Sequence, residues 1–226
     1  ELNIRYSQVL WNHCSNNNIP FLYASSAATY GSGECSFDDR LDISPLLPLN
    51  PYGQSKQDFD VWALAQKKKP PFWVGLKFFN VFGPNEYHKG RMASVVLHAF
   101  NQIAQNNSLK LFKSHHSNYP DGGQIRDFIY VKDLVEIMWF WYKKQNKSGI
   151  YNAGTGEART FNDLASAIFK ALNKESNINY IPTPEDIRDK YQYFTEATMQ
   201  KTRDAGYTQA FYSLENAVKD YVQQYL

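Results

Sequence analysis

The chain has 226 residues, 43% of them apolar, which is enough to bury a sizeable core in one or two compact units. A formal net charge of +2 is too small to indicate nucleic-acid binding, and we expect neither a membrane span nor a secretory leader. The two cysteines, Cys14 and Cys35, exclude a disulfide framework and lack metal-ligand spacing, so we expect free thiols in a reducing cytoplasm and no metal site.

Apolar runs that suit buried strands alternate with amphipathic helical stretches, which favours an α/β fold built on a parallel sheet. In chain order we expect a helix at Leu2–Asn16, a strand at Phe21–Ala24, a helix from about Tyr52 to Lys67, a strand at Trp73–Phe78, a helix from about Met92 to Gln105, a strand near Phe128, a helix at Leu134–Lys143, a strand at Ile150–Asn152, and helices at Phe161–Leu172 and Leu214–Tyr225. Thr160 and Ser213 precede the last two helices and are suited to cap them.

Three polar side chains in the first half of the chain have the types and order used for proton chemistry. Tyr52 and Lys56 are four residues apart, so they share one face of the expected helix. A tyrosine hydroxyl titrates near a pKa of about 10, and a neighbouring ammonium favours the phenolate that general acid/base work needs. Ser26 ends an apolar, strand-like run and can hydrogen-bond a substrate oxygen beside that phenol. The trio predicts an enzyme, although the Tyr-x-x-x-Lys spacing alone also fits an exposed helical pair.

This trio resembles the signature of the extended short-chain dehydrogenase/reductase family, in which a serine or threonine after a central strand is followed by Tyr-x-x-x-Lys. Five further stretches narrow the resemblance to the ADP-glyceromanno-heptose 6-epimerase family: Tyr23–Gly31, Lys77–Pro84, His88–Ser94, Arg126–Asp133 and Tyr151–Gly156. The similarity runs nearly end to end. It implies the C-terminal part of a doubly wound Rossmann-type parallel sheet with a smaller, interleaved α/β substrate domain.

The resemblance implies a division into two domains. We expect residues 1–79 and 126–157 to form a partial NADP-binding domain, and residues 80–125 and 158–226 to form the substrate-binding domain. No glycine-rich turn of the Gly-x-Gly-x-x-Gly type opens a first βα unit, and Gly154-Thr-Gly156 follows a late strand instead. We therefore expect an N-terminally truncated segment, inactive by itself, whose missing part carries the pyrophosphate-binding turn.

The resemblance also implies a reaction. It is the NADP-dependent epimerisation at C6 of ADP-D-glycero-D-manno-heptose to the L-glycero isomer, for the lipopolysaccharide inner core. That carbon carries no acidic C–H, so the centre is oxidised to a planar ketone and then reduced from the other face. The family match implies proton transfer by Tyr52 in one substrate orientation and by Lys89 in the other. Lys56 would tune Tyr52 and hold the nicotinamide ribose, Ser26 would bond the reacting oxygen, and Val81 would contact the cofactor, as Tyr52 and Lys89 do.

The resemblance places a further set of side chains against the substrate. With Ser26 they are Asn80, Arg91, His98, Phe112, Lys113, Ser114, His115, Arg126 and Tyr191.

Several of these residues also have ordinary structural explanations. Lys89 fits a charge on a surface loop, His98 a structural histidine in a helix, and Tyr191 core packing. The Arg126 guanidinium could clamp a diphosphate through two hydrogen bonds or pair with neighbouring Asp127.

Two features depart from the family pattern. Arg91 stands where relatives commonly carry a small residue, so it could contact phosphate or crowd the sugar. The stretch 114–124 is longer than usual and rich in turn formers, which leaves the alignment of residues 113–115 open. It contains His115 and His116, but adjacent histidines without a third ligand do not indicate a metal site.

Other functions remain compatible with the sequence. Ser26, Tyr52 and Lys56 occur widely, so another nucleotide-sugar epimerase or dehydratase of the extended family is the second enzyme hypothesis. The chain could also be a non-catalytic fragment that acts as a binding or assembly module. The resemblance implies a homo-oligomer, preferably a pentamer.

Overall fold

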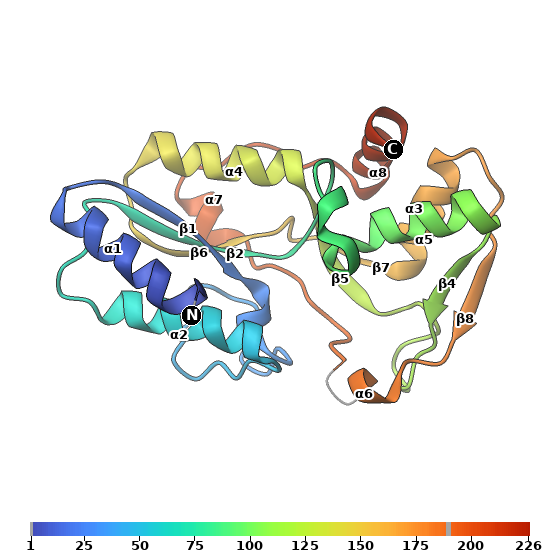
Figure 1. The fold of residues 1–226 in the computed structure, drawn as a ribbon, viewed down its shortest axis with the longest axis horizontal. Coiled ribbons are helices and arrows are strands. Elements are labelled where there is room, and N and C mark those ends of the chain that lie inside the picture. Colours follow the sequence, from blue (N-terminus) through green and yellow to red (C-terminus); the bar gives the residue numbers. More distant parts are fainter. Residues whose placement is uncertain (1, 189–190) are drawn as a thin grey trace. The chain divides into compact units, whose positions relative to one another are not determined.

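The computed structural model describes residues 2–188 and 191–226 (Figure 1). The elements are η1 (Leu2–Tyr6), α1 (Ser7–Asn16), β1 (Phe21–Ser26), η2 (Ala27–Tyr30), α2 (Pro51–Ala65), β2 (Trp73–Phe78), β3 (Asn80–Phe82), η3 (Tyr87–Met92), α3 (Val95–Asn106), β4 (Leu109–Phe112), β5 (Ile125–Tyr130), α4 (Val131–Lys144), β6 (Gly149–Ala153), β7 (Ala158–Thr160), α5 (Phe161–Ala171), β8 (Ile178–Ile181), α6 (Glu185–Arg188), α7 (Gln200–Asp204) and α8 (Leu214–Tyr225). In the part of the chain that is described, no helix has the length and apolar character needed to span a membrane.

The chain forms two compact units, each built from three separate segments. Unit 1 contains the residues up to Phe79, Val135–Gly156 and Ala197–Gln209, and unit 2 contains Asn80–Leu134, Glu157–Glu196 and Ala210–Leu226. This differs from the expected division at residues 126–134 and 157, which lie in unit 2, and at 197–209, which lie in unit 1. The first stretch contains β5, which pairs with β3 and β7 of unit 2. The second is held in unit 1 because Thr198 N donates to Phe37 O.

Unit 1 is built on a parallel sheet with strand order β1-β2-β6. Central strand β2 is buried along its first five residues, as expected for a strand that is covered on both faces. Figure 1 shows α1 and α2 on one face and α4 on the other. On the first face the fully buried Trp11 packs edge-on against aromatic rings of β1, β2 and α2. On the second, Trp141 of α4 lies 4.1 Å from Tyr151 of β6 between ring centroids.

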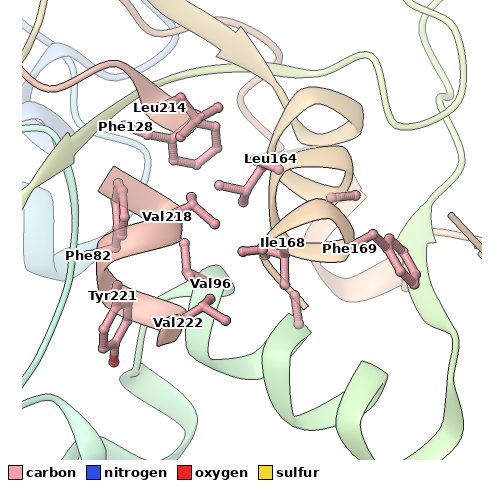
Figure 2. Packing of buried hydrophobic residues seen from close by; sticks show 14 of the residues in the cluster. Phe82, Val96, Phe128, Leu164, Ile168, Phe169, Leu214, Val218, Tyr221 and Val222 are labelled. Carbon is pink, nitrogen blue, oxygen red and sulfur yellow. The ribbon is translucent and has the colours of Figure 1, made fainter. Parts of the chain in front are cut away.

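Unit 2 has a sheet of order β3-β5-β7, in which β7 is antiparallel to β5, and a separate parallel pair β4-β8. Its core lies among α3, α5, α8 and β5. Figure 2 shows Val218 and Val222 of α8 beside Leu164 and Ile168 of α5. The predicted caps are confirmed: Thr160 forms a capping box with Asp163, and the Ser213 hydroxyl accepts from Asn216 N.

Candidate active site

Ser26 is placed by the end of β1. Its backbone is extended, and the next residue begins η2, whose N-terminus the Ser26 side chain caps by accepting a hydrogen bond from Ala28 N at 3.2 Å. The hydroxyl acts as an acceptor in that bond, so its own hydrogen remains able to donate. Ser26 is buried at 8% exposure. The strand end therefore presents a fixed hydroxyl group.

Tyr52 and Lys56 are placed by the first two turns of α2. Asn50 caps this helix by accepting from Gly53 N at 2.8 Å, and Pro51 occupies the first turn, where its missing N–H costs nothing. The Lys56 ammonium lies 5.8 Å from the centroid of the Tyr52 ring, which is 53% exposed. The same ammonium donates to Ala24 O at 2.8 Å, which ties α2 to β1 two residues before Ser26. Unit 1 thus brings Ser26, Tyr52 and Lys56 to one region.

A buried polar network that was not predicted from the sequence lies beneath that region. Asp60 follows Lys56 by one helical turn and pairs with Lys77 of β2 at 2.8 Å, and both side chains are completely buried. The Asp60 carboxylate also accepts from Tyr23 OH at 2.9 Å and Ser25 Oγ at 2.6 Å. Burial lowers the pKa of Lys56, and the Asp60 charge opposes that effect. The signal that could have pointed to the network is a lysine inside an apolar strand.

Lys89 and Arg91 lie on η3 in unit 2, and both side chains are exposed. Lys89 N donates to Glu86 O at 3.0 Å, and Ala93 N donates to Gly90 O at 3.1 Å. Between these two turns Gly90 has φ 53°, a left-handed conformation that favours glycine. The chain here forms a short arch, residues 87–92, with both cations on it.

Glu86 sits at the foot of this arch and is buried at 4% exposure. Its carboxylate accepts from Ser94 N and Ser94 Oγ, both at 2.6 Å, and from Tyr221 OH at 3.0 Å. Burial and the Glu86 charge raise the pKa of Tyr221, so that phenol stays protonated. The role of Glu86 was not predicted from the sequence, because its partner Tyr221 is distant in the chain.

Arg126 of β5 is buried between two aromatic rings. The guanidinium carbon is 5.5 Å from the Tyr191 ring centroid and 5.7 Å from that of Phe161. It donates to Ile125 O at 2.8 Å and to Gln192 O. An ion pair with Asp127, the alternative pairing, is not found among the described side chains, because neighbouring residues of a strand point to opposite faces. Burial lowers the pKa of Arg126, but a guanidinium still remains charged at neutral pH.

The stretch after β4 lies beside Tyr191 and Tyr193. Phe112 meets Tyr191 edge-on at 6.2 Å, and His115 N donates to Tyr193 OH at 2.8 Å. The rings of His116 and Tyr119 in the long loop lie tilted against the same Tyr193 ring, each at 5.2 Å between centroids. The central position of Tyr193 in this ring cluster was not predicted from the sequence.

The other residues of the predicted set are distributed over unit 2. Asn80 and Val81 begin β3, His98 is half-buried in α3, Lys113 is exposed, and Ser114 N donates to Asp121 at 2.8 Å. The paired histidines already have local partners: Thr183 N donates to His115 Nε2 at 3.3 Å, and Asn118 N to His116 Nδ1 at 3.2 Å. Over the described ranges, no group of three His, Cys, Asp or Glu side chains is placed to hold a metal ion.

Comparison with known families gives one match over most of the chain. Residues 1–154 match the NAD dependent epimerase/dehydratase family. An ADP-L-glycero-D-manno-heptose-6-epimerase of Fusobacterium nucleatum is 54% identical over 235 residues, which cover 99% of this chain and 70% of that protein. A protein of the same name from Nitratidesulfovibrio vulgaris is 52% identical over 227 residues, covering 100% of this chain and 70% of its own length.

Solved structures with the same fold include several epimerases, of which two illustrate the range of identity. The Helicobacter pylori ADP-L-glycero-D-manno-heptose-6-epimerase has a TM-score of 0.81 at 31% identity, with 98% of this chain and 64% of that chain covered. The Thermus thermophilus UDP-glucose 4-epimerase in complex with NAD has a TM-score of 0.74 at 24% identity, with 98% and 68% covered, and shows the fold alone. The chain therefore spans about two-thirds of the length of the proteins it matches.

Proposed function

The chain belongs to the NAD dependent epimerase/dehydratase family, and from this premise we propose that it converts ADP-D-glycero-D-manno-heptose to ADP-L-glycero-D-manno-heptose by epimerisation at C6. The observation that carries the proposal is identity of 54% and 52%, across essentially the whole chain, to two curated heptose epimerases. The α/β fold and the Ser26, Tyr52 and Lys56 geometry agree with it.

The residues of unit 1 suit oxidation and reduction at a carbinol carbon. A nicotinamide cofactor, when bound, would accept the hydride in the oxidation and return it in the reduction. The Lys56 ammonium has three N–H groups and uses one on Ala24 O, so two remain for ribose hydroxyls. The ammonium lies beside the Tyr52 ring, and Tyr52 moves the proton of the C6 hydroxyl in this proposal. Ser26 donates its free hydroxyl hydrogen to the same oxygen.

Unit 2 supplies the second proton-transfer group and the nucleotide contacts in this proposal. Lys89 moves the proton when the sugar end has turned over, because epimerisation presents C6 in two orientations. Arg126 is a buried guanidinium that donates to the backbone oxygens of Ile125 and Gln192, and such a group suits a diphosphate. Tyr191 lies beside Arg126, Phe112 meets Tyr191, and His115 is bonded to Tyr193; we propose that Phe112, His115 and Tyr191 contact the rest of the nucleotide sugar.

Further parts of the proposal rest on the resemblance to heptose epimerases. We propose NADP as the cofactor, a cytoplasmic homo-oligomer, preferably a pentamer, and supply of the L-glycero isomer to the lipopolysaccharide inner core. Native mass spectrometry with NADP and NAD offered together tests both the cofactor preference and the assembly.

The central test is conversion of the named substrate. ADP-D-glycero-D-manno-heptose and NADP are supplied to this chain, and to the same chain joined to the part of the Fusobacterium relative that it does not span. The C6 epimer ratio is followed by NMR. We expect Tyr52→Phe and Lys89→Met each to lower the rate by about 10²–10⁴-fold, the usual contribution of a general acid or base, with cofactor still bound.

The matched control for these variants is Lys147→Met, at an exposed lysine of unit 1, which should leave the rate unchanged. Absence of conversion in both proteins, despite folding and bound cofactor, would overturn the heptose assignment and favour another nucleotide sugar.

A further inference from the structure

The arch that carries Lys89 has little packing of its own. The side chains of residues 87–92 are all exposed, and Met92 reaches 84% exposure. A Cβ added at Gly90 would meet no atom within 4 Å, so even the backbone of the arch borders open space. Short exposed segments with few apolar contacts are the parts of a protein that open most readily. The conformation of this arch must therefore be set at its two feet.

One buried carboxylate joins those feet. Glu86 immediately precedes the arch, and its Oε2 and Oε1 accept from Ser94 N and Ser94 Oγ, which follow the arch, at 2.6 Å each. Ser94 is also the N-cap of α3, since its hydroxyl accepts from Leu97 N at 3.3 Å. The second foot is thereby fixed to a helix whose inner face belongs to the core of unit 2.

Helix α8 supports the first foot. Tyr221 OH donates to Glu86 Oε1 at 3.0 Å, and Tyr87 OH donates to Tyr225 O, one turn further along the helix, at 3.0 Å. Tyr221 is completely buried and lies 6.5 Å from Phe82 between ring centroids. The Glu86 carboxylate is thus bonded to Tyr221, which belongs to the core that Figure 2 shows around Val218 and Val222.

We propose that Glu86 is a positioning residue: its carboxylate closes the 87–92 arch between α3 and α8 and so holds Lys89 in the place from which it works. The inference rests on the proposed function in assigning proton transfer to Lys89. It assigns to Glu86 no contact with substrate or cofactor. The arrangement of the oxygens, and not the negative charge alone, is what closes the arch.

A glutamine at this position distinguishes arrangement from charge. Its carbonyl oxygen can accept from Ser94 N, while its amide group donates to the oxygens of Ser94 and Tyr221, because hydroxyl and phenol oxygens accept as well as donate. Alanine removes all three contacts. Glu86→Gln should therefore keep the arch closed, and Glu86→Ala should open it.

Limited trypsin digestion of the chain reads the opening directly, because Lys89 and Arg91 are both trypsin sites within the arch. Lys110 lies in β4 of unit 2 and reports general unfolding of that unit. We expect Glu86→Ala to raise cleavage after Lys89 and Arg91, relative to cleavage after Lys110, by more than about tenfold, and Glu86→Gln by less than about threefold. Tyr221→Phe removes a single hydrogen bond, keeps the buried ring, and should raise it by about two- to threefold.

The outcomes separate this proposal from the proposed function. Unchanged cleavage in Glu86→Ala, an equal rise at Lys110, or equal opening by glutamine and alanine would each overturn the positioning role. In a protein that epimerises the heptose, Glu86→Ala should lower kcat by at least about tenfold with KM changed by less than about threefold, and glutamine should restore most of it. A parent protein without epimerase activity would remove the proposed function, while the digestion would still decide whether Glu86 closes the arch.

Discussion

Asp39 is a buried carboxyl group with only part of its hydrogen-bonding capacity used. Oδ2 accepts from Asn152 N at 2.6 Å, whereas Oδ1 has no hydrogen-bond partner in the structure as described. The residue is 3% exposed. Burial outweighs the Asn152 bond and the attraction of Lys201, and raises the pKa of Asp39 to about 6. At neutral pH the native state therefore holds an ionised carboxylate that burial disfavours.

Replacing Asp39 by asparagine should stabilise the protein in a pH-dependent way. A raised folded pKa means that the stabilising contribution of Asp39 is complete below its ordinary pKa near 3.8 and is lost as the pH rises through about 6. The free energy of unfolding of Asp39→Asn, relative to that of the parent, should be about 2 kcal/mol larger at pH 7.5 than at pH 4. Urea unfolding at both pH values measures the difference, and any pH-independent effect of the amide cancels. Parallel pH profiles would contradict the assignment.

Single residues were predictable where the chemistry is local in the chain. Tyr52 and Lys56 share a helical turn, so their spacing alone brings them together, and Ser26 ends the strand to which Lys56 is bonded through Ala24 O. Glu86 could not be found this way, because its partner Tyr221 lies 135 residues further along the chain. Asp60 was missed because Lys77, at 17 residues, belongs to a strand that reads as purely apolar apart from that lysine.

Helix α2 is joined to the sheet of unit 1 by a buried ion pair. Asp60 on the helix faces Lys77 on β2, and Lys77 also donates to Thr29 Oγ1 at 2.6 Å. Buried pairs of this kind contribute little relative to apolar packing, but removing one partner leaves an uncompensated buried charge.

Lys77→Met should therefore lower the free energy of unfolding by about 3–5 kcal/mol. Adding Asp60→Asn should recover part of the loss, because it replaces the carboxylate that Lys77→Met leaves buried without a partner by a neutral amide. Chemical denaturation of Lys77→Met, of Asp60→Asn and of the double variant measures this, with exposed Lys147→Met as the control that should change stability by less than about 0.5 kcal/mol. Simple addition of the two losses in the double variant would show that the pair is not coupled.

At the scale of elements, long periodic stretches were predictable and short strands were not. The strand at Trp73–Phe78 and the helix at Leu214–Tyr225 are confirmed at both ends, whereas the helix expected from Met92 begins at Val95, after its Ser94 cap. The strands β3, β4, β7 and β8 have only three or four residues, too few for a period-two pattern to stand out. Their existence depends on partners distant in the chain.

At the scale of the whole molecule, the chain alternates between two units with separate cores. Ile168 is fully buried in the core of unit 2, and Leu76 is buried in β2 of unit 1. Each truncation to alanine should cost about 2–5 kcal/mol, by lost burial and by the cavity left behind. Hydrogen exchange followed by mass spectrometry should then rise mainly in unit 2 for Ile168→Ala and mainly in unit 1 for Leu76→Ala. Equal acceleration throughout the chain in both variants would mean that the two units open as one.

The alternation of segments also limits how this protein can be recombined with its relatives. Six segments contribute in turn to the two units, so five boundaries separate them, one of which falls between Leu134 and Val135 inside α4. A hybrid gene made from two homologues with a single crossover therefore combines residues of both parents within the core of at least one unit. Exchange of a complete unit between two homologues requires junctions at every boundary, and a shuffled library screened for soluble protein should be enriched in such multiply joined hybrids. A unit that folds around one core is therefore not a segment that a single exchange of DNA can transfer.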